Sequence, residues 1–174
     1  MSKQDSKAGF SLNKSATHLL HRAQQAAVTL SAGALGAKGL TIRQFAVLAA
    51  LYGQDDQSQS SLVEMTGIDR STLADMVSRM EHSRLIRRVT SKTDARVKAV
   101  SLAAAGIKAY TNAAVQVAAA DAELLKDLSK SQRKDLLKAL AQLTGATTYK
   151  ANSKKSKKGG KSGKKKKKKK NKSG

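Results

Sequence analysis

Apolar residues recur at helical spacing in the first part of the chain and predict two helices. The pattern from Leu12 to Leu30 predicts a long first helix over residues 11–31. The segment 31–39 contains three glycines and should end that helix. Thr41 can cap a second helix because its hydroxyl can accept a bond from a first-turn amide. The residues expected on the inward face of this second helix are Ile42, Phe45, Leu48, Ala49 and Tyr52.

A polar loop and two shorter helices are predicted next. The loop covers residues 53–59, and Ser60 or Ser61 opens a short helix that ends near Gly67. Asp69 is placed to cap a further helix over residues 70–83. One narrow apolar stripe runs along that helix and consists of Leu73, Met76, Val77 and Met80.

After this helix the spacing of apolar residues becomes strand-like, and further along the chain it becomes helical again. Residues 85–89 and 97–102 have strand-like content and flank a polar turn, which predicts a two-stranded hairpin. An alanine-rich helix follows over residues 103–128, and a capping-box sequence at Ser129 opens a last helix that reaches residue 143. The expected inward residues of the alanine-rich helix are Ile107, Tyr110, Ala114, Val117, Leu124 and Leu128, whereas Arg133 on the last helix should face solvent.

Charge divides the chain into two unlike parts. The net charge is +22, and the 14 lysines between residues 150 and 174 have no acidic neighbour there. The first 149 residues hold 20 Lys and Arg against 12 Asp and Glu, which leaves +8. A segment of Lys, Ser, Gly and Asn has nothing to bury and repels itself, so we expect a body over residues 1–147 and a disordered tail over residues 148–174. The run most suited to sequence-independent phosphate binding is Lys164, Lys165, Lys166, Lys167, Lys168, Lys169 and Lys170.

Several function classes find no support in the composition. The chain has no cysteine, so disulfides and thiolate sites are absent. His18 and His21 lie one turn apart, but no third metal ligand is nominated, and they are interpreted as solvated or interface residues. No catalytic constellation, cofactor motif or membrane span is recognisable, so we expect a cytoplasmic, nucleoid-associated protein that is not an enzyme.

The segment 60–102 has the order of a helix-turn-helix followed by a basic hairpin. The apolar stripe would clamp the second helix to the first and leave its opposite face free for base edges and phosphates. This segment is also the most basic part of the body. The expected DNA-binding residues are Arg70, Ser71, Thr72, Asp75, Ser78, Arg79, Arg87, Arg88, Lys92, Arg96 and Lys98.

The same segments resemble the MarR-type transcriptional regulators. The matching stretches are LTIRQFAVLAAL from residue 40, SLVEMTGIDRSTLADMVSRMEHSRLIRR from residue 61 and DARVKAVSLAAAG from residue 94. The resemblance implies a mainly α fold, a winged helix-turn-helix with a two-stranded wing, and a homodimer formed by helices near residues 11–31 and 103–143. It also implies that the helix 70–83 enters the major groove and that Arg96, in the wing 90–98, enters the minor groove.

The sequence departs from the family pattern at some positions. Asp75 stands where a basic residue is frequent, and Ala95 replaces a common arginine. Ser83 and Arg84 stand where a glycine is usual before the first wing strand. Arg96 could instead pair with Asp94 and only stiffen the wing. A small aromatic or anionic effector ligand, bound by many family members, is left open as a partner.

Two function hypotheses follow. The first is a DNA-binding transcriptional regulator, expected to be a dimeric repressor whose tail adds non-specific phosphate binding to duplex DNA. The second is a nucleoid-associated architectural protein with little sequence preference, which the tail favours. An RNA-associated protein is less favoured because aromatic platforms for unstacked bases are missing. A tail that only maintains solubility, or that binds anionic membrane, is likewise less favoured.

Overall fold

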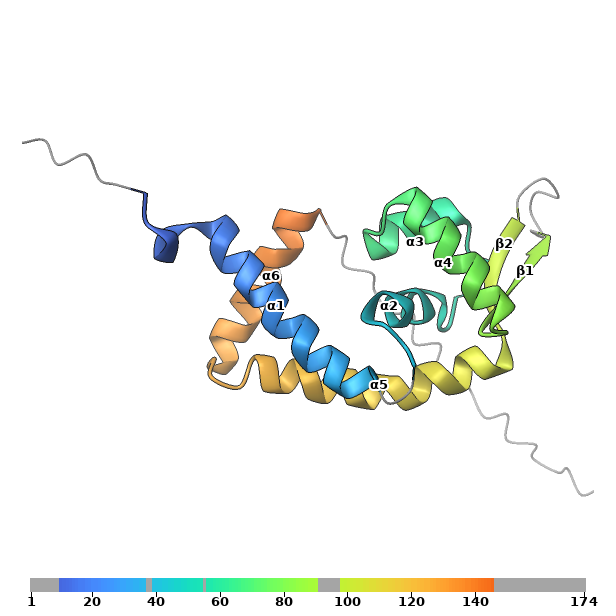
Figure 1. Cartoon of the computed structure of the whole chain (residues 1–174). Helices are drawn as coiled ribbons and strands as arrows, with labels where there is room; N and C mark the ends of the chain where they lie inside the picture. The colour runs from blue at the N-terminus through green and yellow to red at the C-terminus, as the bar shows by residue number, and fades with distance from the viewer. Residues whose placement is uncertain (1–9, 37–38, 55, 91–97, 146–174) are drawn as a thin grey trace, which may run out of the picture.

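The computed structural model describes residues 10–36, 39–54, 56–90 and 98–145 of the chain. Helix α5 runs along the molecule, with α1 and α6 at one end of it and a smaller unit of α2, α3, α4 and a two-stranded sheet along the rest (Figure 1). This arrangement confirms the predicted mainly α winged helix-turn-helix. The predicted tail 148–174 and the tip of the wing lie outside the described residues.

The first helix begins and ends later than the sequence pattern predicted. Leu12 belongs to a separate 3-10 turn, Leu12–Lys14, and α1 covers Ala16–Leu35, with the hydroxyl of Ser15 accepting the amide of His18. The predicted end at residue 31 was wrong, because the helix continues through Gly33 to the buried Leu35. One helical glycine costs only about 1 kcal/mol, which packing of the last turn against α5 can offset.

Helix α2, Ile42–Leu51, lies between α3 and α5 (Figure 1). The predicted cap at Thr41 is confirmed as a full capping box, in which Thr41 and Gln44 bond each other's amides. The predicted inward face was partly wrong. Ile42 and Tyr52 are exposed, while the buried residues of α2 are Val47, Leu48 and Leu51. Both wrongly assigned residues lie at the ends of the helix, since Ile42 is its first residue and Tyr52 its C-cap.

The helix-turn-helix consists of α3, Gln59–Thr66, and α4, Arg70–His82. Ser58 caps α3, so the predicted start at Ser60 or Ser61 was wrong by two or three residues. Gly67 ends α3 in the left-handed conformation (φ 67°), as the turn requires, and the cap at Asp69 is confirmed. All four residues of the predicted stripe on α4 are buried.

The wing strands are β1, Ile86–Thr90, and β2, Lys98–Leu102, paired antiparallel with Ile86 opposite Leu102. The loop before α3 adds a contact that the sequence did not predict. Gln57 pairs with Val100 on the other edge of β2, and the Ser101 hydroxyl donates to Asp56 Oδ1 (3.2 Å). The outer edge of β2 is thereby tied to the loop that precedes α3.

Helix α5, Ala104–Leu124, leads from the wing to the side of the molecule where α1 and α6 lie (Figure 1). Ile107 is exposed, contrary to prediction, and the buried residues of α5 are Gly106, Ala113, Val117 and Ala120. Small side chains line this face because α1 crosses it. A Cβ on Gly106 would overlap the backbone carbonyl of Leu85, so this position requires glycine.

Helix α6, Lys130–Thr144, begins with the predicted capping box of Ser129 and Gln132. Arg133 does not simply face solvent as expected. It is half-buried and donates hydrogen bonds to the carbonyls of Leu128 (2.9 Å) and Lys126 (3.1 Å), which closes the connection between α5 and α6.

Candidate nucleic-acid interface

Helix α4 presents a polar face opposite its buried stripe. Leu73 and Val77 are almost fully buried, so the helix cannot rotate about its axis. The sequence-predicted residues of α4 therefore lie together on the outer side of the helix. Those that are exposed are Arg70, Ser71, Asp75, Ser78 and Arg79, and Thr72 is half-buried. An exposed helix face of arginines, hydroxyls and one carboxylate can donate to and accept from base edges and phosphates.

The first turn of α4 is held by hydrogen bonds of its cap. Asp69 Oδ1 accepts the Thr72 amide (2.9 Å) and the Ser71 hydroxyl (2.7 Å). Hydrogen bonds from the Thr72 side chain and backbone, and then from Ser71, hold the pKa of the Asp69 carboxyl well below its usual range. The Asp69 carboxylate is thus occupied by hydrogen bonds at the start of α4, and these bonds fix the orientation of the exposed residues that follow.

Ser60 of α3 joins this surface, although sequence reasoning did not select it. Arg70 Nη2 donates to Ser60 Oγ (3.2 Å), and both residues are exposed. The sequence did offer a signal, since Ser60 is a hydroxyl residue in the first turn of α3, ten residues before Arg70. The pairing itself could not be predicted because it depends on how α3 and α4 cross.

The two adjacent arginines of β1 lie in different environments. Arg87 is exposed. Arg88 is half-buried, and its Nε lies 3.2 Å from Oε2 of Glu81 on α4. Its backbone amide also donates to Oε1 of Glu81 (3.2 Å). Lys92 and Arg96 lie outside the described residues, and for Lys98 only the strand position is described.

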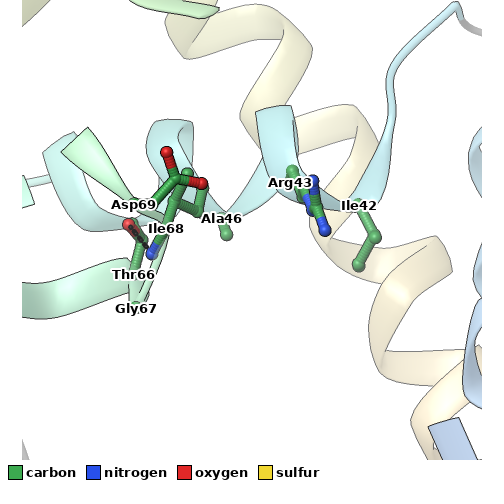
Figure 2. Close-up of a pocket in the computed structure, with 7 residues that line it drawn as sticks. All are labelled: Ile42, Arg43, Ala46, Thr66, Gly67, Ile68 and Asp69. Atoms are coloured by element: carbon green, nitrogen blue, oxygen red, sulfur yellow. Dashed lines mark hydrogen bonds between the residues drawn. The ribbon is translucent and has the colours of Figure 1, made fainter. Parts of the chain in front are cut away.

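A groove of about 260 Å³ separates α2 from the turn between α3 and α4. Figure 2 shows Ile42 and Arg43 on one side of the groove and residues 66–69 on the other, with Ala46 next to Ile68. The only carboxylate of the groove is that of Asp69, which is already bonded to its own helix. Among the residues that line the groove, Arg43 therefore carries the one positive charge and Asp69 the one negative charge.

Three aromatic rings stack between α2 and α5. The Tyr110 ring lies 4.2 Å from Tyr52 and 5.7 Å from Phe45, measured between ring centroids, with interplanar angles of 29° and 13°. Tyr52 retains 46% of its exposure. The stack joins α2 to α5 and offers one partly open aromatic face.

Metal binding and membrane spanning find little support within the part of the chain that the structure describes. That part holds no group of three His, Cys, Asp or Glu side chains placed to bind a metal ion. His18 is half-buried and His21 is exposed. Among the described helices, none is long and apolar enough to cross a lipid bilayer.

Known proteins share this architecture. The sequence profile described as MarR family matches residues 40–98. The transcriptional regulator HosA of Escherichia coli O111:H- is 31% identical over 107 residues, which cover 62% of this chain and 79% of HosA. BpsR of Bordetella bronchiseptica, whose DNA binding is regulated by 6-hydroxynicotinic acid, has a TM-score of 0.75 at 24% identity, over 80% of this chain and 99% of its own. The repressor CouR bound to a 23-mer DNA duplex has a TM-score of 0.70 at 26% identity, over 76% and 94% of the two chains.

With an anchored polar helix beside a two-stranded wing, the molecule has the winged helix-turn-helix fold. The chain is 31% identical to HosA over 79% of HosA, and the MarR family profile matches its residues 40–98. The chain therefore belongs to the MarR family. It is accordingly a transcriptional regulator and not an enzyme.

Proposed function

We propose that the protein is a dimeric, sequence-specific repressor that inserts α4 into the major groove of duplex DNA. The observation that carries this proposal is the exposed polar face of α4 opposite a fully buried stripe. Arg70 and Ser60 would contact phosphates, because their hydrogen bond places them at the start of α4. Asp75 and Ser78, further along the same face, would meet base edges, where a carboxylate can accept from a cytosine amine.

The wing is proposed to contact the adjacent minor groove through Arg96, with Arg87, Lys92 and Lys98 near phosphates. The antiparallel register of β1 and β2 supports this, since Thr90 and Lys98, which flank the wing residues 91–97 in the sequence, pair at the end of the sheet opposite to Ile86. Losing one groove contact should cost about 1–3 kcal/mol. Arg96→Ala should therefore weaken binding to an operator-like duplex by ~10-fold, while Arg22→Ala on the exposed face of α1 should leave it unchanged. Equal losses for the two variants would place the interface elsewhere.

Dimer formation is proposed through α1, α5 and α6. No residue of α6 is buried in the single chain, and Leu137 (57% exposed) and Leu143 (73% exposed) are uncovered, as are Phe10 and Leu12 before α1. Apolar residues gathered on helices of one side usually mark an interface. Light scattering at low micromolar concentration should give twice the chain mass of 18.4 kDa.

A substitution pair on α6 tests which surface forms the dimer. Leu137→Glu should yield monomers, since it places a charge on the proposed apolar interface. Lys138→Glu introduces the same side chain at an exposed polar position of the same helix and should leave the dimer intact. A wild-type monomer, or a Leu137→Glu variant that remains dimeric, would contradict the proposal.

The 14 lysines of residues 150–174 are proposed to add binding that does not depend on sequence. Each lysine that neutralises a phosphate releases counterions, so log K falls with log salt by ~0.9 per contact. If about five lysines of each chain engage at once, removing residues 150–174 should reduce the slope by ~4–5 units per chain. Truncation should weaken binding to all duplexes alike and leave the melting temperature unchanged. An unchanged slope would exclude contact between these lysines and DNA.

A second candidate function, a nucleoid-associated architectural protein, is favoured by the same lysines. Competition between an enriched duplex and a random duplex separates the two functions. A preference of about 10³ or more is expected of a specific regulator. A preference below about tenfold would favour the architectural role.

We also propose that a small aromatic or anionic ligand modulates DNA binding. The half-exposed ring of Tyr52 in the aromatic stack supports this, as does the regulation of BpsR by 6-hydroxynicotinic acid. Titration of aromatic carboxylic acids should quench tyrosine fluorescence in the wild-type protein and less so in Tyr52→Ala. If no such acid alters either fluorescence or DNA affinity, the proposal fails.

A further inference from the structure

Glu81 lies in the last turn of α4 and contacts the neighbouring strand β1 at two points. Its Oε1 accepts the backbone amide of Arg88, and its Oε2 lies 3.2 Å from Arg88 Nε. Both side chains are partly shielded, with 38% and 29% of their surfaces exposed. A single carboxylate therefore accepts a hydrogen bond from the backbone of one wing residue and forms an ion pair with its side chain.

The sheet register explains why the Arg88 amide is available. Val100, opposite Arg88, exchanges both of its backbone hydrogen bonds with Gln57 on the far edge of β2. In an antiparallel pair, the residue facing such a position points its own amide away from its partner strand. The amide of Arg88 thus lies on the outer edge of β1, and Glu81 satisfies it.

The base of the wing is fixed independently of this contact. The amide of Leu85 donates to the Met80 carbonyl (2.9 Å), and that of Arg84 to the Glu81 carbonyl (2.9 Å), which ends α4 in a Schellman motif. The Leu85 carbonyl in turn accepts the Ala103 amide (3.0 Å). These bonds hold the strand where it begins. The contact with Glu81 acts three residues further along, where the wing extends beside α4 (Figure 1).

We infer that Glu81 is a positioning residue that sets the wing strand against α4, so that both elements reach their grooves together. Arg88 serves this contact and is not itself a phosphate ligand. The inference rests on the proposed binding of DNA by α4 and the wing. It also assigns a role to an acidic residue inside the most basic segment of the body, where a negative charge would otherwise weaken attraction to DNA.

The two roles of Arg88 give opposite results for one substitution. If Glu81 positions the wing, Glu81→Gln should lower affinity for an enriched duplex about tenfold, because wing contacts are lost together. Affinity for a random duplex should stay the same or rise slightly, since one negative charge has been removed. If Arg88 instead binds phosphate and Glu81 restrains it, Glu81→Gln should tighten binding to both duplexes.

The experiment compares the wild-type protein with Glu81→Gln and Glu64→Gln on a duplex enriched from a random pool by the wild-type protein. Glu64 is an exposed residue of α3, so Glu64→Gln removes the same charge without the contact. Hydroxyl-radical footprints should show that Glu81→Gln loses protection on the wing side and keeps it on the α4 side. Hydrogen exchange of the Arg88 amide should accelerate in Glu81→Gln alone, and this readout needs no DNA.

The possible results distinguish failure of the positioning role of Glu81 from failure of the proposed DNA-binding function. A Glu81→Gln variant that binds and footprints like Glu64→Gln overturns the positioning role, and so does unchanged exchange at Arg88. A wild-type protein that protects no duplex overturns the proposed function, and the positioning role with it. A fall in sequence preference confined to Glu81→Gln, together with faster exchange at Arg88, supports both.

Discussion

Arg84 occupies a backbone conformation that glycine adopts without strain. It follows α4 with φ at +58°, as the left-handed residue of the Schellman motif. A side chain in this region costs roughly 1–2 kcal/mol, since Cβ approaches the following carbonyl oxygen. Glycine avoids that cost but loses about 0.4–1 kcal/mol through the greater entropy of its unfolded chain. We therefore expect Arg84→Gly to stabilise each chain by about 0.5–1 kcal/mol.

Thermal unfolding without DNA measures this effect. A gain of that size should raise Tm by ~1–4 °C for a body of this length. Arg84→Ala is the matched control, because it removes the same charge but keeps Cβ, and its Tm should not rise. Arg84→Asn should fall between them, as asparagine tolerates the left-handed region. If Arg84→Ala stabilises the protein as much as Arg84→Gly does, relief of charge repulsion is the cause and the argument from backbone strain is refuted.

Three further predictions concern the body. Gly106→Ala should destabilise the protein by about 1–3 kcal/mol in urea unfolding, because its Cβ would overlap the Leu85 carbonyl; an unchanged midpoint would contradict this close approach. Arg133→Ala should lower stability by about 1–2 kcal/mol through loss of two hydrogen bonds to backbone carbonyls, and a neutral result would mean that they do not persist in solution. Asp69 has a depressed pKa, so its stabilisation should be complete above the unfolded value of about 3.9 and decline as the pH falls further; Tm measured against pH should lose this component in Asp69→Asn.

Local signals in the sequence predicted most of the fold. The caps at Thr41, Asp69 and Ser129 are confirmed because a helix start depends on a hydroxyl or carboxylate and amides within four residues of it. The buried stripe of α4 is likewise confirmed, since one side of that helix is covered and the other is exposed.

Contacts between distant residues could not be predicted in the same way. The pairing of Gln57 with Val100 and the contact of Glu81 with Arg88 both depend on where separate elements lie in space. Arg133 was expected in solvent because a charged residue on a final helix usually lies there, yet the carbonyls of the preceding turn bind it. The inward face of α2 was misassigned at Ile42, which is the first residue of the helix and is exposed.

The composition predicted the basic surface, but it did not predict which arginines of that surface are exposed and which are engaged in ion pairs. Sequence reasoning grouped Arg87 with Arg88, whereas the structure leaves one exposed and pairs the other with a carboxylate. A count of positive charges measures attraction to phosphates, and it cannot separate the arginines that are available from those engaged in ion pairs.

Selection of bound duplexes from a random pool by the full-length protein tests the central claim most directly. If two copies of α4 enter successive major grooves, the enriched sequences should contain a two-fold symmetric motif. Its half-sites should lie about 10–10.5 base pairs apart from centre to centre, or a multiple of that distance. Substitution at Asp75 or Ser78 should change the preferred bases of each half-site without abolishing the symmetry. A pool that shows no enriched motif, or an enriched motif that stays the same in those variants, would contradict sequence reading by α4.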